Sequence, residues 1–169
     1  MIDSTEFSAL LSTIRLLALD VDGVMTDGGL YYTETGEELK KFNVKDGLGI
    51  QLVMKAGIHI AIVSAGFSSA TLYRAKRLGI EHTFIGVEDK LATIQKLCEQ
   101  LDLSLSQVAY MGDDLIDLPV LQAVGCPITV ADAMPANQAI ALYITQKAGG
   151  QGAVREVCDL LVQSNLSRR

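Results

Sequence analysis

Short apolar runs alternate with longer amphipathic stretches along most of the chain, and this alternation limits its possible folds more than any other feature. The apolar runs have the length of buried strands and cover residues 14–19, 59–63, 83–85, 108–111, 128–130 and 142–144. The amphipathic stretches have helical spacing and cover residues 48–56, 69–78, 91–101, 119–124 and 153–162. Because parallel strands need crossover helices, we predict an α/β fold with a Rossmann-like parallel sheet and helices on both faces.

One segment, residues 29–43, interrupts this alternation. It contains a strand-like Tyr-Tyr pair, a turn at Glu34-Thr35-Gly36 and a second short run that ends near Phe42. This pattern predicts a β-hairpin outside the main sheet. An isolated hairpin is barely stable in water, so we expect Tyr31, Tyr32 and Phe42 to pack in an oligomer interface. No repeat or linker divides the rest, which predicts a single domain over residues 1–169 with a frayed tail at 164–169.

The charge balance restricts the partners of this domain. The chain has 14 basic and 20 acidic residues and a net charge of −6, which argues against nucleic acid or an anionic membrane surface as the main partner. No apolar run approaches the roughly 18 residues that span a bilayer, and no secretory leader is visible, so we expect a cytoplasmic protein. Cys98, Cys126 and Cys158 are far apart, which predicts buried thiols and no zinc site or disulfide.

Residues that can bind a ligand through polar side chains or backbone N–H groups follow four of the apolar runs, where the predicted strands end. They are Asp20, Asp22, Ser64, Ala65, Gly66, Lys90, Asp113, Asp114 and Asp117. Ligands of such sheets bind at the carboxyl ends of the strands, so we expect these residues to meet at one edge. Clustered carboxylates repel one another, and an oxygen-only set of ligands suits Mg²⁺. The lysine, the serine hydroxyl and nearby backbone N–H groups add donors for a phosphoryl group.

The spacing of the first two aspartates indicates their chemistry. Residues i and i+2 of an extended segment project the same way, so Asp20 and Asp22 can flank one reacting group. Asp20 would attack phosphorus and Asp22 would protonate the leaving oxygen, then activate water. Gly23, directly after them, permits a close approach of the backbone.

The motifs DVDGVMTDG at 20–28, Ser64, Lys90 and GDDLID at 112–117 resemble, in order, the four motifs of haloacid dehalogenase-type phosphatases. The resemblance implies Asp20 as nucleophile and Mg²⁺ ligand, and Asp22 as acid/base and ligand through its carbonyl. Asp113 would be the third protein ligand of the metal. The phosphoryl group would be bound by Ser64, Ala65 and Lys90. The remaining two, Asp114 and Asp117, would orient Lys90 or metal-bound water.

Three longer stretches, GEELKKFNVKDGLGI, VAYMGDDLIDLPV and GGQGAVREVCDLL, are similar to members of that family that lack a separate cap domain. This likeness implies a homotetramer in which a neighbouring subunit covers the active site, and a phosphatase that acts on an eight-carbon 3-deoxy sugar acid phosphate in lipopolysaccharide precursor synthesis. It also suggests that Asp46, Gly66 and Arg155 contact the substrate. As alternatives, Asp46 caps a helix, and the segment 149–152 is only a flexible entry to a helix.

The loop after the second strand departs from the family pattern. It has Ser64-Ala65-Gly66-Phe67 where Thr-Gly-Arg-Lys or a similar polar sequence is typical. Serine keeps the hydroxyl, but glycine at 66 removes a basic donor for the sugar or its carboxylate. The alternative substrate is a nine-carbon acidic sugar phosphate, such as 3-deoxy-nonulosonate or N-acylneuraminate 9-phosphate. A non-enzyme alternative is a receiver-like phosphoacceptor module, although there the acidic pair precedes the hydroxyl and the lysine.

Overall fold

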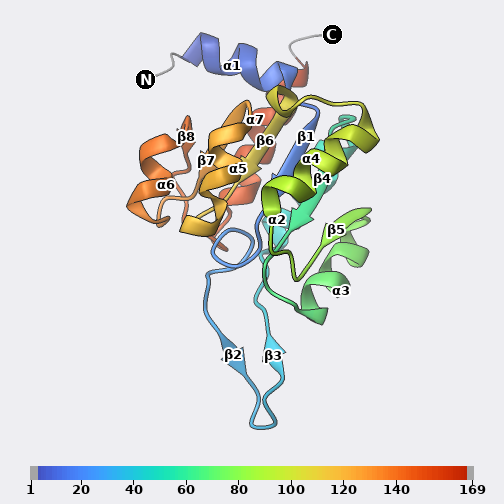
Figure 1. Ribbon diagram of the computed structural model, residues 1–169, viewed down its shortest axis with the longest axis vertical. Helices are drawn as coiled ribbons and strands as arrows, with labels where there is room; N and C mark the ends of the chain where they lie inside the picture. The colour runs from blue at the N-terminus through green and yellow to red at the C-terminus, as the bar shows by residue number, and fades with distance from the viewer. Residues whose placement is uncertain (1–3, 167–169) are drawn as a thin grey trace.

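The computed structural model describes residues 4–166 and contains a parallel sheet with helices on both faces (Figure 1). Its strand order is β5-β4-β1-β6-β7-β8, and every neighbouring pair is parallel. The strands are β1 (Leu16–Leu19), β4 (His59–Val63), β5 (His82–Phe84), β6 (Val108–Met111), β7 (Cys126–Thr129) and β8 (Tyr143–Ile144). The predicted fold class is confirmed.

The helices cover the sheet through two apolar clusters, one on each face. The helices are α1 (Ser4–Thr13), α2 (Val44–Lys55), α3 (Ser69–Leu78), α4 (Lys90–Leu101), α5 (Leu118–Ala123), α6 (Pro135–Ile140) and α7 (Ala153–Leu166). In β1, Leu17 and Leu19 join the cluster that includes α1, α2 and α7, whereas Leu16 and Ala18 join the cluster that includes α4 and α5. Alternate side chains point to opposite faces, so a strand buried on both must be apolar throughout. Each buried leucine contributes roughly 1.5–3 kcal/mol.

Two helices were not predicted from the sequence. Helix α1 packs Phe7, Leu10 and Leu11 against the first cluster, and the spacing of these residues was the available signal. Helix α6 is short and begins at Pro135, a favoured first residue. Helix α7 continues through residues 164–166, which we expected to fray, and Ser164 is buried. Residues 167–169 of that expected tail lie outside the described part of the chain.

The predicted hairpin is present and projects away from the sheet, beyond the carboxyl ends of its strands (Figure 1). It pairs β2 (Tyr31–Tyr32) with β3 (Glu38–Leu39) in antiparallel fashion. Both tyrosines are exposed, but Phe42 is partly buried against the first apolar cluster and lies under the guanidinium of Arg74. Phe42 therefore packs in part against the core of its own chain, and its predicted place in an oligomer interface stays a prediction.

Two further features of the described residues bear on the sequence predictions. Cys98, Cys126 and Cys158 are buried free thiols, as expected. Within residues 4–166, every helix is too short or too polar to cross a bilayer.

Candidate active site

The loop after β1 places Asp20 at the carboxyl edge of the sheet. Its backbone N–H donates to the carbonyl of Met111 in β6, and its side chain is buried. The chain then turns at Gly23, whose φ of +85° is left-handed. A Cβ at Gly23 would lie 2.0 Å from Asp113 Oδ2, so only glycine lets this turn pass the second carboxylate.

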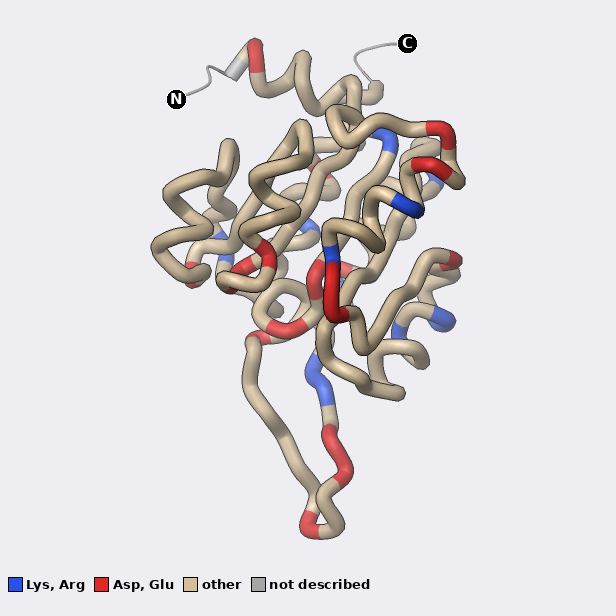
Figure 2. Tube along the Cα trace, in the orientation of Figure 1, with Lys and Arg blue, Asp and Glu red and all other residues tan. Residues whose placement is uncertain are grey.

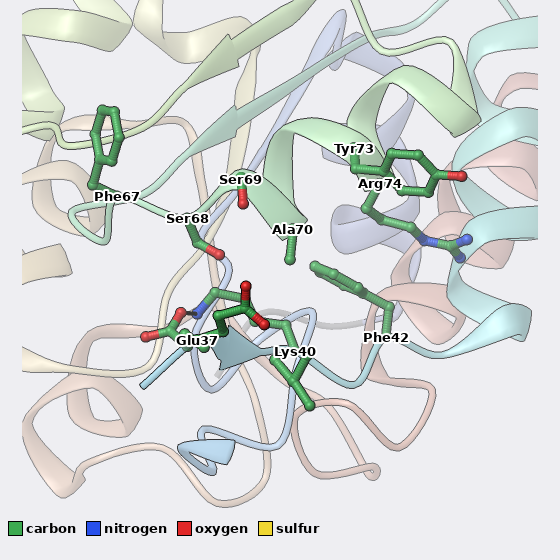
Figure 3. A pocket seen from close by; sticks show the side chains of 11 residues that line it. Glu37, Lys40, Phe42, Phe67, Ser68, Ser69, Ala70, Tyr73 and Arg74 are labelled. Atoms are coloured by element: carbon green, nitrogen blue, oxygen red, sulfur yellow. Dashed lines mark ion pairs between the residues drawn. The ribbon is translucent and has the colours of Figure 1, made fainter. Parts of the chain in front are cut away.

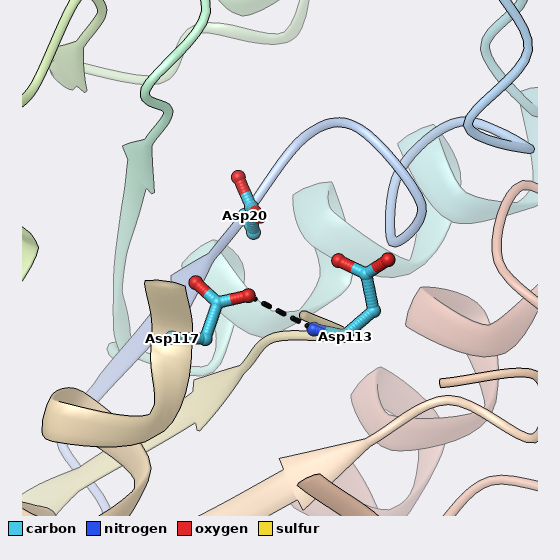
Figure 4. A group of neighbouring side chains, drawn as sticks. All are labelled: Asp20, Asp113 and Asp117. Atoms are coloured by element: carbon cyan, nitrogen blue, oxygen red, sulfur yellow. Dashed lines mark hydrogen bonds between the residues drawn. The ribbon is translucent and has the colours of Figure 1, made fainter. Parts of the chain in front are cut away.

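Asp117 organises the loop after β6 from a fully buried position. Its Oδ2 accepts the backbone N–H of Asp113 at 3.0 Å (Figure 4) and that of Asp114 at 3.2 Å. Its Oδ1 accepts from Tyr110 Oη at 2.5 Å and from Lys90 Nζ at 2.7 Å. Both oxygens are engaged with donors, so Asp117 fixes the loop and the lysine. The neighbouring Asp114 accepts the N–H of Leu115 and caps a short 3₁₀ turn, Leu115–Asp117.

The carboxylates of Asp20, Asp113 and Asp117 converge, with one oxygen of each within 4.8 Å of the others (Figure 4). Lys90 Nζ lies 2.8 Å from Asp20 Oδ2 and forms ion pairs with both Asp20 and Asp117. Burial raises the pKa of Asp20 to about 7, and the charge of Asp117 adds to this, while Lys90 opposes it. Burial, together with Asp20 and Asp117, also raises the pKa of Asp113 to about 7.

These groups fit a hard divalent cation. Asp113 Oδ1 is buried, and none of the residues 4–166 hydrogen-bonds it. Buried carboxylate oxygens need a partner, and a cation supplies one while reducing the repulsion that raises both pKa values. The cluster offers oxygen ligands alone, the set that Mg²⁺ prefers.

A pocket of about 120 Å³ joins this cluster to the loop after β4. It is lined by Asp20, Asp22, Ser64, Ala65, Gly66, Asp113, Asp114 and Ile116. The structure therefore brings the predicted catalytic residues together with Ser64 and Ala65. Lys90 does not line this pocket, but it forms an ion pair with Asp20, which does. The volume of the pocket is well below the roughly 300–1,000 Å³ of sites that enclose a whole small molecule, so it suits a phosphoryl group.

A larger groove of about 840 Å³ lies between the hairpin and α3 (Figure 3). Its lining includes two basic residues, two acidic residues and three aromatic residues, which are Lys40, Arg74, Glu37, Glu38, Phe42, Phe67 and Tyr73. Figure 2 shows a basic segment at the base of the hairpin beside acidic segments, in agreement with the ion pairs of Lys40 with Asp22 and of Lys41 with Asp27. Lys40 was missed from the sequence: its Nζ donates to Asp22 Oδ1, and no local motif indicates that contact.

Asp46 and Arg155 do not line the pocket. Asp46 Oδ1 accepts the backbone N–H of Arg155 at 2.8 Å, so Asp46 caps the first turn of α7. Its own helix, α2, is capped by Asn43. The guanidinium of Arg155 pairs with Asp159. Within this chain these two residues hold α2 against α7, and the suggested substrate contacts gain no support.

The glycines at 149 and 150 pack against the loop after β1. A Cβ at Gly149 would lie 1.8 Å from the carbonyl oxygen of Gly23, and Gly150 donates its N–H to the carbonyl of Val24. This segment thus supports the turn that carries Asp20 and Asp22. The interpretation that it is only a flexible entry to a helix is incomplete.

The sequence and the fold of this chain are similar to those of known proteins. A family model of haloacid dehalogenase-like hydrolases matches residues 86–157. A 3-deoxy-D-manno-octulosonate 8-phosphate phosphatase from Escherichia coli (strain B / BL21-DE3) is 47% identical over 159 residues, which cover 94% of this chain and 85% of that protein.

Two solved structures are similar over nearly the whole chain. The phosphatase of the same name from Moraxella catarrhalis, in complex with a magnesium ion, a phosphate ion and the free sugar acid, is 41% identical with a TM-score of 0.93; the match covers 96% of this chain and 93% of that one. The cobalt-bound deoxy-D-mannose-octulosonate 8-phosphate phosphatase from Haemophilus influenzae is 38% identical with a TM-score of 0.89, covering 92% and 91%.

Proposed function

The chain belongs to the 3-deoxy-D-manno-octulosonate 8-phosphate phosphatases of the haloacid dehalogenase-like hydrolases, and we propose that the pocket formed by Asp20, Asp22, Ser64 and Asp113 is its active site. It is a Mg²⁺-dependent phosphatase that hydrolyses this ester to the free sugar acid and phosphate. The observation that carries the assignment of the site is the convergence of Asp20 and Asp113 beside Lys90.

Asp20 and Asp113 would hold Mg²⁺ with their carboxylates, and Asp22 with its backbone carbonyl. Bound there, Mg²⁺ neutralises the carboxylates and withdraws charge from the phosphoryl oxygens. Ser64 and the backbone N–H of Ala65 would donate to the phosphoryl group from the opposite side of the pocket, where the loop after β4 lines it. Lys90, held by Asp117, adds a positive charge that attracts the same group.

In the first step, a carboxylate oxygen of Asp20 forms a bond to phosphorus as the bond between phosphorus and the sugar oxygen breaks. Asp22 gives its proton to that departing oxygen. In the second step, Asp22 takes a proton from water, the water oxygen bonds to phosphorus, and the bond from Asp20 to phosphorus breaks. Asp22 lines the same pocket as Asp20, as both steps require.

The sugar acid would occupy the groove between the hairpin and α3. Arg74 supplies positive charge there for a carboxylate and compensates for the basic residue that is absent at Gly66, whereas Lys40 is already paired with Asp22 and Glu38. The free sugar acid would then enter lipopolysaccharide precursor synthesis. A nine-carbon acidic sugar phosphate remains the competing substrate.

We further propose a homotetramer in the cytoplasm, in which the exposed tyrosines of the hairpin, Tyr31 and Tyr32, pack against other subunits. Leu30 and Leu39 are also exposed on the hairpin, and Leu39 is paired with Tyr31, so apolar side chains of this segment are open to water. Sedimentation velocity of the wild-type protein and of a Tyr31→Ser/Tyr32→Ser variant tests this assembly.

The decisive assay measures phosphate release from eight-carbon and nine-carbon 3-deoxy sugar acid phosphates side by side with Mg²⁺. We expect the eight-carbon ester to have the higher kcat/KM, and comparable values across the panel would defeat the substrate assignment. Asp20→Asn is expected to abolish turnover with the fold intact. Undiminished turnover by Lys90→Ala would count against the phosphate site.

A further inference from the structure

Lys40, from the hairpin, donates a hydrogen bond to the side chain of Asp22, which is 18 residues earlier in the sequence. Its Nζ lies 2.5 Å from Asp22 Oδ1 and 2.9 Å from Glu38 Oε1. The side chain of Lys40 is only 5% exposed, whereas that of Asp22 is 41% exposed. Among residues 4–166, Lys40 is the one hydrogen-bond donor to the Asp22 carboxylate. The orientation of Asp22 therefore depends on a residue of the hairpin.

The other oxygen of Asp22 faces the pocket. A Cβ at Gly66, in the loop that would bind the phosphoryl group, would lie 3.1 Å from Asp22 Oδ2. The two oxygens of one carboxylate thus have separate environments, with Oδ1 held by Lys40 and Oδ2 directed at the loop after β4. Rotation of the carboxylate away from this position would break the ion pair of Lys40.

Such a rotation is costly because the ammonium group is buried. If Asp22 rotated away, the buried ammonium group would lose one of its two ion pairs and keep only the one with Glu38. Glu38, on β3, holds Lys40 from the hairpin side, so the lysine bridges the hairpin and the loop after β1. The arrangement restrains an otherwise half-exposed side chain.

We propose that Lys40 is a positioning residue for the proton transfers of Asp22: by binding Oδ1 it directs Oδ2 at the oxygen that leaves phosphorus. This inference rests on the proposed function and adds a hairpin residue to its mechanism. The proton passes from Asp22 Oδ2 to the sugar oxygen as the phosphorus–oxygen bond breaks, and Lys40 keeps its own protons. The hairpin thereby takes part in leaving-group protonation.

The test compares leaving groups that differ in their need for a proton. An alkoxide needs protonation, whereas p-nitrophenolate departs without it. The quantity measured is kcat/KM, which reports the steps up to formation of the aspartyl phosphate and excludes its later hydrolysis. The three substrates are 3-deoxy-D-manno-octulosonate 8-phosphate, glycerol 3-phosphate as an alkyl phosphate without a carboxylate, and p-nitrophenyl phosphate.

The variants are Lys40→Met, Lys40→Gln and Lys40→Arg, with Lys41→Met as the matched control. Lys41 is the next residue, its side chain is 58% exposed, and it pairs with Asp27. Thermal unfolding of each variant shows whether it is folded. Two neutral substitutions are used so that the test can still be made if one of them does not fold.

For Lys40→Met and Lys40→Gln, we expect kcat/KM to fall at least about tenfold further with both alkyl phosphates than with p-nitrophenyl phosphate, since general acid catalysis typically contributes 10²–10⁴-fold. Lys40→Arg should recover most of this loss, and Lys41→Met should behave as wild type. An equal loss with all three substrates would overturn the inference. So would a loss confined to the acidic sugar phosphate, which would make Lys40 a ligand of its carboxylate. A wild-type protein inactive on every substrate would instead refute the proposed function.

Discussion

Replacing Gly23 by alanine should displace the carboxylate of Asp113, a proposed metal ligand. The new Cβ would lie 2.0 Å from Asp113 Oδ2 and 2.6 Å from its Cγ, whereas real Cβ contacts are essentially never under 3.0 Å. Asp113 must therefore move by about 1 Å, and a displacement of that size in an active site can reduce activity about 100-fold. Metal coordination is strict as well, with ligand distances held within about 0.2 Å.

The same substitution also introduces backbone strain, which a control must remove. Gly23 has a φ of +85°, and an L-residue in that region costs about 1–2 kcal/mol. Gly28, in the same loop, has a φ of +73°, but its nearest neighbours would lie 3.6 Å from a new Cβ, an ordinary contact. Gly28→Ala therefore has the strain without the collision.

Activity and Mg²⁺ dependence of both variants separate the two effects. Each should lower the unfolding temperature by roughly 2–8 °C, given about 2–4 °C per kcal/mol for a chain of this size. Gly23→Ala alone should lose about 100-fold in kcat/KM and need more Mg²⁺ for half-maximal rate. If both variants lose activity equally, strain in the loop is the cause and the displacement of Asp113 is refuted.

Three further predictions follow from the described contacts. Burial raises the pKa of Asp46 to about 6, above the ordinary range of an aspartate, so the wild-type protein loses stability from this group as pH rises from about 4 to 6. Asp46→Asn keeps an acceptor for the Arg155 N–H and should be more stable than wild type at pH 7 by about 1–3 kcal/mol, measured by urea unfolding at pH 4 and pH 7. Its KM should be unchanged, and a raised KM would show that Asp46 touches the substrate. Tyr110→Phe removes a buried hydroxyl that donates to Asp117 and should lower the free energy of unfolding by about 1.5–3 kcal/mol in the same measurement. A decrease below about 0.5 kcal/mol, roughly the smallest value for a hydrogen bond, would contradict the importance of this contact. Mg²⁺ at about 100 times its Kd should stabilise the fold by about 2.7 kcal/mol, whereas KCl at equal ionic strength should not. Asp113→Asn should abolish this stabilisation, and stabilisation by Mg²⁺ that persists in the variant would place the metal elsewhere.

The sequence alone was sufficient for the fold class and the principal acidic residues. Strands buried on both faces must be apolar throughout, as β1 is, so their positions can be read from a short window. Asp20, Ser64 and Asp113 follow such strands, and parallel strands end at one edge, which explains why they line one pocket. Each of these inferences depends on local pattern and chain direction only.

Only the tertiary structure decided what the other polar residues do. Asp117 and Asp114 stand in one motif, yet Asp117 binds Lys90 and Tyr110 whereas Asp114 caps a turn. Asp46 lies at the start of α2 but caps α7, because it accepts the N–H of Arg155, which is 109 residues later in the sequence. Lys40 and Lys41 are adjacent identical residues, and one is buried against Asp22 while the other is exposed. A side chain's partner depends on which distant segments pack beside it, and neither residue type nor spacing records that packing.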